Sequence, residues 1–159
     1  MAGGAGGERA LVSVRIAGDD EVGALTSLRR RWNQESRGRP LDDTTFEDRF
    51  AAWWAAEHET RTFFLAALDG EAVGMANVKH YTRMPAAGMA SAGRWGYVGN
   101  VFVLAEHRDA GIGQALMEHI VRWAATEGFE HLRLAPSERS IPFYARLGFV
   151  PGAVVELDP

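Results

Sequence analysis

The segment EHRDAGIGQAL, at residues 106–116, has the composition of a phosphate-binding turn at the start of a helix. Arg108, Gly111 and Gly113 follow the spacing R-x-x-G-x-G. A helix N-terminus presents unpaired backbone N–H groups and a partial positive charge, so it favours anions. Glycines let the backbone approach a phosphate closely, and arginine adds a charged donor. We therefore expect a pyrophosphate to bind here; the alternative is a glycine turn that only allows a strand and a helix to pack tightly.

Two widespread nucleotide-binding motifs do not fit this turn. A P-loop requires a lysine directly after its last glycine, and no such lysine follows Gly113. A dinucleotide-binding fingerprint requires a third glycine at the position where this chain has Leu116. The phosphate ligand must therefore be one that another class of site recognises.

The elements predicted around the turn alternate between strands and helices. Strand patterns cover 10–18, 60–68, 71–82, 95–104, 130–135 and 153–157. Helices are expected from Asp19 or Asp20 to Gly38, from within 42–46 to about Glu59, from Gly111 to Glu127, and over 137–147. The order β-α-α-β-β-β-α-β-α-β predicts a single α/β domain, with a mixed central sheet flanked by helices.

Local signals mark several of the turns and helix ends. Asp69 and Gly70 form a dipeptide typical of a type I′ hairpin turn. Thr44 and Glu47 have the spacing of a capping box at the start of the second helix. Residues 83–94 form a loop that is long enough to be functional or mobile.

Composition bounds the classes of function. The 159 residues suffice for one domain, expected over 9–159 after a disordered tail at 1–8. Cysteine is absent, and the five histidines show no zinc-type spacing, so we expect no metal. The net charge of −4 argues against nucleic acid as a partner. No apolar run is long enough for a membrane span and no secretory signal is visible, so a cytoplasmic protein is expected.

Two segments together resemble the GNAT superfamily of acyl-CoA-dependent N-acetyltransferases. VFVLAEHRDAGIGQAL, at 101–116, resembles its acetyl-CoA-binding motif, and SIPFYARLGF, at 140–149, resembles its C-terminal helix-to-strand motif. The predicted order of elements also matches that fold from residue 10 onward. The resemblance implies acetyl-CoA as co-substrate and a fourth strand that splays from the fifth, where the pantetheine arm pairs with strand backbone.

The resemblance implies a set of cofactor contacts made largely by backbone groups. Pantetheine would lie along the strand, and the pyrophosphate would lie on the turn. Asp109 stands where many relatives have glycine, and its charge would lie near the pyrophosphate. Ser137 replaces an asparagine that relatives often carry before the last helix. The cofactor-binding residues implied are Val101, Phe102, Val103, Arg108, Asp109, Ala110, Gly111, Ile112, Gly113, Gln114, Ser137 and Tyr144.

Tyr144 is implied to be the general acid of the reaction. A phenol with an ordinary pKa near ~10 is protonated at neutral pH, so it can donate a proton to the departing CoA thiolate. The alternative from position alone is a core tyrosine beside Phe143 and Phe149. Because the chain has no cysteine, a cysteinyl acyl-enzyme is excluded and transfer would be direct, in a ternary complex.

The sequence offers no strong candidate for the general base. Some family members carry a glutamate on the fourth strand, but WGYVGNVFV contains no carboxylate. Glu106 and His107 lie in the turn and are expected to be solvated. Two weak candidates are left: Glu57, whose alternative is a solvated helix end, and His80, whose alternative is a surface or hairpin histidine. Tyr97 or Asn100 would at most order a water.

These observations predict an N-acetyltransferase of the EC 2.3.1 type that transfers acetyl from acetyl-CoA to a primary amine of a small molecule or peptide. A homodimer is one possible assembly. The first two helices and the loop at 83–94 are expected to choose the acceptor, and the tryptophans at 53–54 either line its pocket or belong to the core. Two rivals remain: a non-catalytic acyl-CoA-binding regulatory module, and an interaction protein that kept only the fold.

Overall fold

The computed structural model describes residues 11–158, and its centre is a five-stranded sheet in the order β1-β2-β3-β4-β5. The strands span Val12–Ile16, Arg61–Leu68, Glu71–Thr82, Arg94–Val103 and Leu132–Arg133. The first four run antiparallel to their neighbours, and β5 lies parallel to β4. The mixed sheet confirms the predicted α/β class. The tail expected at 1–8 lies outside the described residues.

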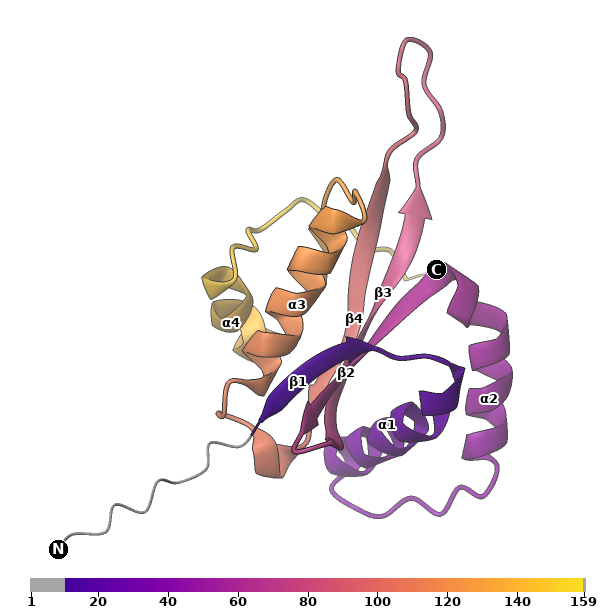
Figure 1. Cartoon of the computed structure of the whole chain (residues 1–159), viewed down its shortest axis with the longest axis vertical. Coiled ribbons are helices and arrows are strands. Elements are labelled where there is room, and N and C mark those ends of the chain that lie inside the picture. Colours follow the sequence, from indigo (N-terminus) through magenta and orange to yellow (C-terminus); the bar gives the residue numbers. More distant parts are fainter. Residues whose placement is uncertain (1–10, 159) are drawn as a thin grey trace, which may run out of the picture.

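Helices cover both faces of this sheet (Figure 1). Helix α1 spans Val22–Arg37, α2 spans Phe46–Glu57, α3 spans Ile112–Thr126 and α4 spans Ile141–Arg146. Helix α3 places Leu116, Met117 and Ile120 in the core at spacings of three and four, and none of them is exposed to solvent. Leu25 and Leu28 of α1 are buried as well. The sheet therefore lies between two layers of helices that pack apolar side chains against it.

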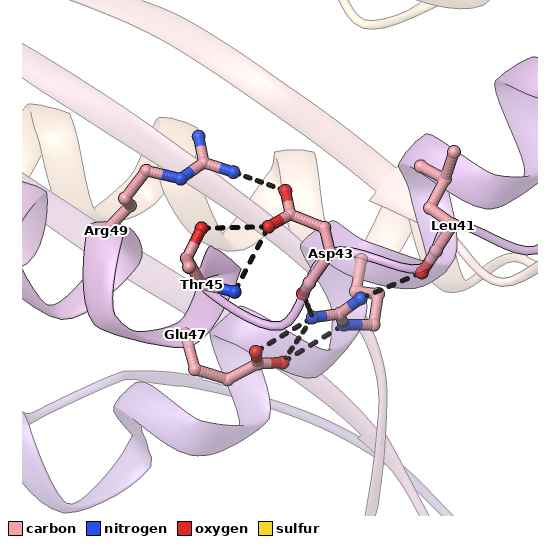
Figure 2. A network of polar contacts seen from close by, with 6 residues as sticks. Leu41, Asp43, Thr45, Glu47 and Arg49 are labelled. Carbon is pink, nitrogen blue, oxygen red and sulfur yellow. Dashed lines mark hydrogen bonds and ion pairs between the residues drawn. The ribbon is translucent and has the colours of Figure 1, made fainter.

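Helix α2 is held by a polar network that differs from the predicted capping box (Figure 2). Thr45 is the N-cap residue and makes no side-chain capping bond; its N–H donates to Asp43 Oδ1 at 3.2 Å. Glu47 instead accepts from Arg30 of α1 at 2.8 Å. Arg30 also donates to the Leu41 and Asp43 carbonyls. Glu47 therefore forms an ion pair with α1 and does not cap its own helix, and this ion pair links α1 to α2.

The predicted cap of α1 is also wrong. Asp19 and Asp20 lie in a 3₁₀ turn, Asp19–Glu21, and neither caps the helix. Asp19 Oδ1 accepts a hydrogen bond from Trp54 Nε1 at 2.9 Å, so this carboxylate anchors α2 instead. By contrast, Gly38 ends α1 with a φ of 63°, as predicted.

The hairpin between β2 and β3 confirms the type I′ prediction. Asp69 and Gly70 have φ values of 49° and 90°, and both central residues of this turn require positive φ. The longer connection between β3 and β4 extends beyond the helices (Figure 1). The expected loop lies at residues 83–93, where Arg83 pairs with Glu130 at 3.0 Å just beyond the end of α3, and it lies at the other end of that helix from the turn before it.

The strand predicted at 153–157 is wrong. Residues 149–158 have no regular structure, and Val154, Val155 and Leu157 are exposed. The β-branched residues favour an extended chain, but a strand is stable only when its backbone finds a partner. Strand β5 is likewise reduced to Leu132–Arg133.

Candidate active site

The site begins where β4 loses its neighbour β5. The two strands pair only at Gly96 with Leu132 and at Tyr97 with Arg133, whereas β4 continues to Val103. On the far side, the Leu104 N–H donates to the Val73 carbonyl at 2.9 Å. Strand residues alternate the direction of their backbone groups, so the polar groups of Val101 and Val103 face the open edge. This confirms the splay expected between the two strands.

A cleft of about 750 Å³ lies along this open edge. Its walls come from α1, β4, the segment after β5, and α4. Six of the proposed cofactor-binding residues line it: Val101, Phe102, Val103, Arg108, Ser137 and Tyr144. The cleft also holds Pro136, whose missing N–H suits a strand end without a neighbour.

The glycine turn leads from this cleft into α3. Gly111 is the N-cap residue with a φ of 78°, and Asp109 also adopts a left-handed φ, 59°. No hydrogen bond within residues 11–158 is found for the N–H groups of Asp109, Ala110 and Gly111. The first N–H groups of a helix have no intrahelical partner either. Free donors therefore run from Asp109 to Gln114, where the sequence placed a pyrophosphate.

The glycines are not explained by tight packing. A Cβ built on Gly111 meets nothing within 4 Å, and one on Gly113 makes ordinary contact with Phe143 at 3.6 Å. Gly111 is required by its positive φ, and the space above it is open. Ile112 is 1% exposed, so it offers only its backbone to a ligand.

Arg108 is engaged differently from the prediction. Its guanidinium pairs with Glu35 of α1, and its Nε donates to the Val103 carbonyl at 3.0 Å. Its N–H donates to the Ala105 carbonyl at 3.3 Å, so this backbone group is not among the free donors. The side chain ties the turn to α1 because a carboxylate that the motif did not indicate, Glu35, lies opposite.

Tyr144 of α4 faces the cleft while its ring packs beside Phe143 and Phe149. Burial raises the pKa of Tyr144 above its ordinary value, because the phenolate would lose solvation. The phenol is thus protonated throughout the neutral range. Tyr144 thus packs against the core and also lines the cleft, and its role as the acid stays a prediction.

Glu57 and His80 lie away from Tyr144. Glu57 accepts from Lys79 and Arg61 at 2.8 Å, and these bonds hold the pKa of Glu57 below its ordinary value. Neither Glu57 nor His80 lines the cleft. The two cations stabilise the Glu57 carboxylate and so make it a weaker proton acceptor. The geometry therefore does not support Glu57 as a base.

His80 faces the opposite side of the sheet. Its ring packs against Trp123 and Phe129, and its Nε2 lies 3.0 Å from the Thr62 hydroxyl. Strand β3 pairs His80 with Gly96 and Lys79 with Tyr97, so successive residues point to opposite faces. His80 does not line the cleft, and its ring is held among the aromatic side chains of Trp123 and Phe129.

A second cavity, of about 310 Å³, adjoins the cleft and had no sequence motif to indicate it. Helices α1 and α2 form one side, and strands β2, β3 and β4 form the other. Its lining residues are Arg29, Phe46, Arg49, Phe50, Trp53, Phe63, Met75, Ala76, Asn77 and Asn100. Of the two tryptophans, Trp53 lines this cavity and Trp54 is 8% exposed in the core.

Asn100 belongs to both cavities and links them. It has a φ of 55°, next to a register shift between β3 and β4, and asparagine tolerates this conformation. Asn77 donates to Asn100 Oδ1 at 2.8 Å, and Arg61 donates to Asn77 Oδ1 at 2.9 Å. Because arginine can only donate, the direction of this chain is fixed, and the Asn100 amide N–H groups are left to donate.

Two further kinds of feature, a metal-binding cluster and a membrane-spanning helix, are not found in the described residues. Within residues 11–158, no three histidine, aspartate or glutamate side chains are grouped to hold a metal ion. No helix in the same range combines the length and apolar character of a membrane span.

Comparisons with known proteins place this geometry in a family. The family model of the acetyltransferase (GNAT) family matches residues 24–149. A curated glucosamine 6-phosphate N-acetyltransferase from Trypanosoma brucei brucei is 32% identical over 80 residues, which cover 50% of this chain and 52% of the relative. The chain thus matches about half the length of that relative.

Solved structures show the same fold. A predicted acetyltransferase from Clostridium acetobutylicum, solved with acetyl-CoA, has a TM-score of 0.71 at 18% identity over 93% of this chain and 96% of that one. A GCN5-related N-acetyltransferase from Ralstonia eutropha has a TM-score of 0.72 at 22% identity, covering 94% and 99%. With the family model matching most of its length, this chain belongs to the acetyltransferase (GNAT) family.

Proposed function

We propose that this protein transfers an acetyl group from acetyl-CoA directly to the primary amine of a small molecule, in a ternary complex. One observation carries the proposal: the cleft along the open edge of β4 meets the second cavity at Asn100. The cleft would hold acetyl-CoA and the second cavity the amine. Their junction is the place where thioester and amine would meet.

The hydrogen-bonding groups along the cleft and the adjoining turn match those of acetyl-CoA. The backbone of Val101 and Val103 offers unpaired strand groups to the amides of pantetheine, although the Val103 carbonyl already accepts from Arg108. The N–H groups from Asp109 to Gln114 offer donors to the diphosphate. Ser137 also lines the cleft, and its hydroxyl, which lies 3.0 Å from the Ser140 hydroxyl, would keep an acceptor lone pair for the ligand.

In the transfer step, the amine nitrogen attacks the thioester carbonyl, a C–N bond forms and the C–S bond breaks. The Asn100 amide would donate to the carbonyl oxygen as negative charge develops there. Tyr144 would give its proton to the departing thiolate and regain one from solvent. The amine proton would leave through water, because the described lining of the second cavity contains no carboxylate or histidine.

The volume of the second cavity favours a small molecule over a peptide as acceptor. About 310 Å³ is near the lower end of the ~300–1,000 Å³ typical of small-molecule pockets. The name of the T. brucei relative adds an amino sugar phosphate to the amines that deserve testing. We propose a cytoplasmic location, with which the absence of cysteine is compatible.

Initial-rate kinetics of CoA thiol release would test this function. Acetyl-CoA and each amine of a panel are varied together. We expect thiol release that depends on the amine and double-reciprocal lines that intersect, as a ternary complex requires. Parallel lines would contradict direct transfer. Acetyl-CoA binding without thiol release on any amine would identify a regulatory acyl-CoA-binding module instead.

A further inference from the structure

Arg29 is a half-buried cation in the wall of the second cavity, and no carboxylate within residues 11–158 pairs with it. The next two arginines of α1 are both neutralised: Arg30 by Glu47 and Arg31 by Glu106. Arg49, which lines the same cavity, pairs with Asp43. Arg29 therefore differs from its neighbours on the helix and across the cavity.

What contacts Arg29 is an aromatic ring. Its Cζ lies 4.5 Å from the centroid of the Trp32 ring, which stacks in turn on Phe102 with ring centroids 5.4 Å apart. Burial also lowers the pKa of Arg29, because the guanidinium loses solvent. A cation–π contact compensates this loss only in part, and buried charges are normally paired. A half-buried guanidinium that lacks a carboxylate partner within residues 11–158 and lines a cavity can pair with an anion that enters it.

Apart from Arg49, Asn77 and Asn100, the rest of the cavity wall is apolar. Phe46, Phe50 and Trp53 of α2 form a chain of aromatic contacts, with centroids 6.0 and 5.5 Å apart. Phe63 closes it from β2, at 5.8 Å from Trp53. These rings offer contact area to the apolar part of a ligand and few hydrogen-bond partners.

The polar groups at the inner end are nearly all in use. The Asn77 side chain accepts from Arg61 and donates to Asn100, and it is 2% exposed. A polyhydroxylated acceptor would lose its water there without gaining matching hydrogen bonds. The cavity therefore favours a body without hydroxyl groups.

We propose that the acceptor is an apolar α-amino acid whose carboxylate binds Arg29, whose side chain packs on Phe46, Phe50 and Trp53, and whose amine reaches Asn100. This assignment rests on the acetyl transfer proposed above. An α-amino acid combines in one small molecule the anion, the apolar body and the primary amine that the three parts of the cavity require.

The substrate test compares amines that differ in one group. L-phenylalanine, L-leucine and L-methionine are each assayed beside the decarboxylated amine with the same body, and beside glucosamine 6-phosphate. We expect kcat/KM for the best amino acid to exceed that of its decarboxylated partner by more than tenfold. Equal values would overturn the carboxylate contact. A faster reaction with glucosamine 6-phosphate would overturn the apolar body.

The variant Arg29→Gln assigns the effect to one residue. We expect KM for the best amino acid to rise more than tenfold while KM for acetyl-CoA is unchanged, which also shows that the variant is folded. Arg29→Lys keeps the charge but not the planar fork, so its KM should lie between. Arg37→Gln removes an exposed charge from the last turn of the same helix and should behave like the wild type. An unchanged KM in Arg29→Gln would contradict the proposal.

A binding measurement separates this inference from the acetyl transfer on which it rests. N-acetyl-L-phenylalanine is titrated calorimetrically into the wild type and into Arg29→Gln. Binding that Arg29→Gln loses, in a protein that acetylates no amine, would support the anion site and overturn the transfer reaction. Acetylation of neutral amines, with product affinity equal in both proteins, would overturn the anion site and keep the transfer reaction.

Discussion

The cleft and the second cavity are built from different parts of the chain. The cleft offers mainly backbone groups, from the open edge of β4 and the turn before α3. The second cavity offers side chains from α1, α2, β2, β3 and β4, which lie far apart in the sequence. A site built from backbone needs glycines and positive φ in a fixed order, so it leaves a motif. A site built from converging side chains leaves none, and such a site can vary its ligand while the fold stays the same.

The largest effect should come from Tyr144, the proposed acid in the cleft. Tyr144→Phe removes the proton donor and keeps the ring between Phe143 and Phe149, so kcat should fall about 100-fold. Affinity for acetyl-CoA, measured by calorimetry, should change little. Tyr81→Phe, at an exposed ring stacked on Trp95, is the matched control. Equal turnover by Tyr144→Phe at every pH would remove it from the acid role.

Gly111→Glu should weaken acetyl-CoA binding at the cleft and leave the second cavity unchanged. The substitution puts a negative charge beside the free N–H groups and strains a φ of 78°, so acetyl-CoA affinity should fall more than tenfold, ~1.4 kcal/mol or more. Gly128→Glu imposes similar strain, at a φ of 74°, beyond the other end of α3. If both folded variants bind acetyl-CoA as the wild type does, the turn does not hold the diphosphate.

Asn100→Asp should sharpen the comparison, since this residue belongs to both cavities. The carboxylate keeps the shape and tolerates the positive φ, but it cannot donate to the thioester oxygen. We expect kcat/KM for both substrates to fall at least tenfold, because losses of ~10²–10³ in kcat are typical when such a donor is removed. A rise in kcat/KM would mean that this position accepts a proton, which the present assignment excludes.

The smallest effect on the reaction should come from Glu57, which lies outside both cavities. Glu57→Gln should leave the pH profile of kcat/KM unchanged, with activity rising with pH as the amine deprotonates. Because ion pairs hold the pKa of Glu57 below its ordinary value, its contribution to stability is present at neutral pH and is lost as the pH falls through the lowered value.

Thermal unfolding would show the second part of this prediction. The melting temperature of Glu57→Gln should lie below that of the wild type at about pH 7, and the two should converge in acid. A shifted pH profile of kcat/KM in the same variant would return Glu57 to the role of base.

The sequence predicted the elements that carry strong local signals. The turn at Asp69-Gly70, the end of α1 at Gly38 and the apolar stripe of α3 all depend on residues close in the chain. The strand at 153–157 was predicted wrongly because its pattern carries no information about a partner strand. The caps at Asp19 and Thr44 failed because Asp19 and Glu47 make contacts with other helices instead.

The same distinction holds within the site. The open edge of β4, the free donors before α3 and the place of Tyr144 follow from contiguous motifs. The pairing of Arg108 with Glu35 and the junction at Asn100 depend on residues from different elements. The isolation of Arg29 from carboxylates is visible only once its neighbours are placed. His80 illustrates the limit: its residue type suits a base, but its ring packs against Trp123 and Phe129 and does not line the cleft.

The central claim, that the cleft holds acetyl-CoA, is tested most directly by calorimetric titration of the wild type with acetyl-CoA, desulfo-CoA and ATP. Our account predicts micromolar binding of acetyl-CoA and desulfo-CoA, because both carry the pantetheine arm and the diphosphate, and much weaker binding of ATP. No binding of either CoA compound to the folded protein would contradict the account, and the chain would then have kept the fold without the cofactor site.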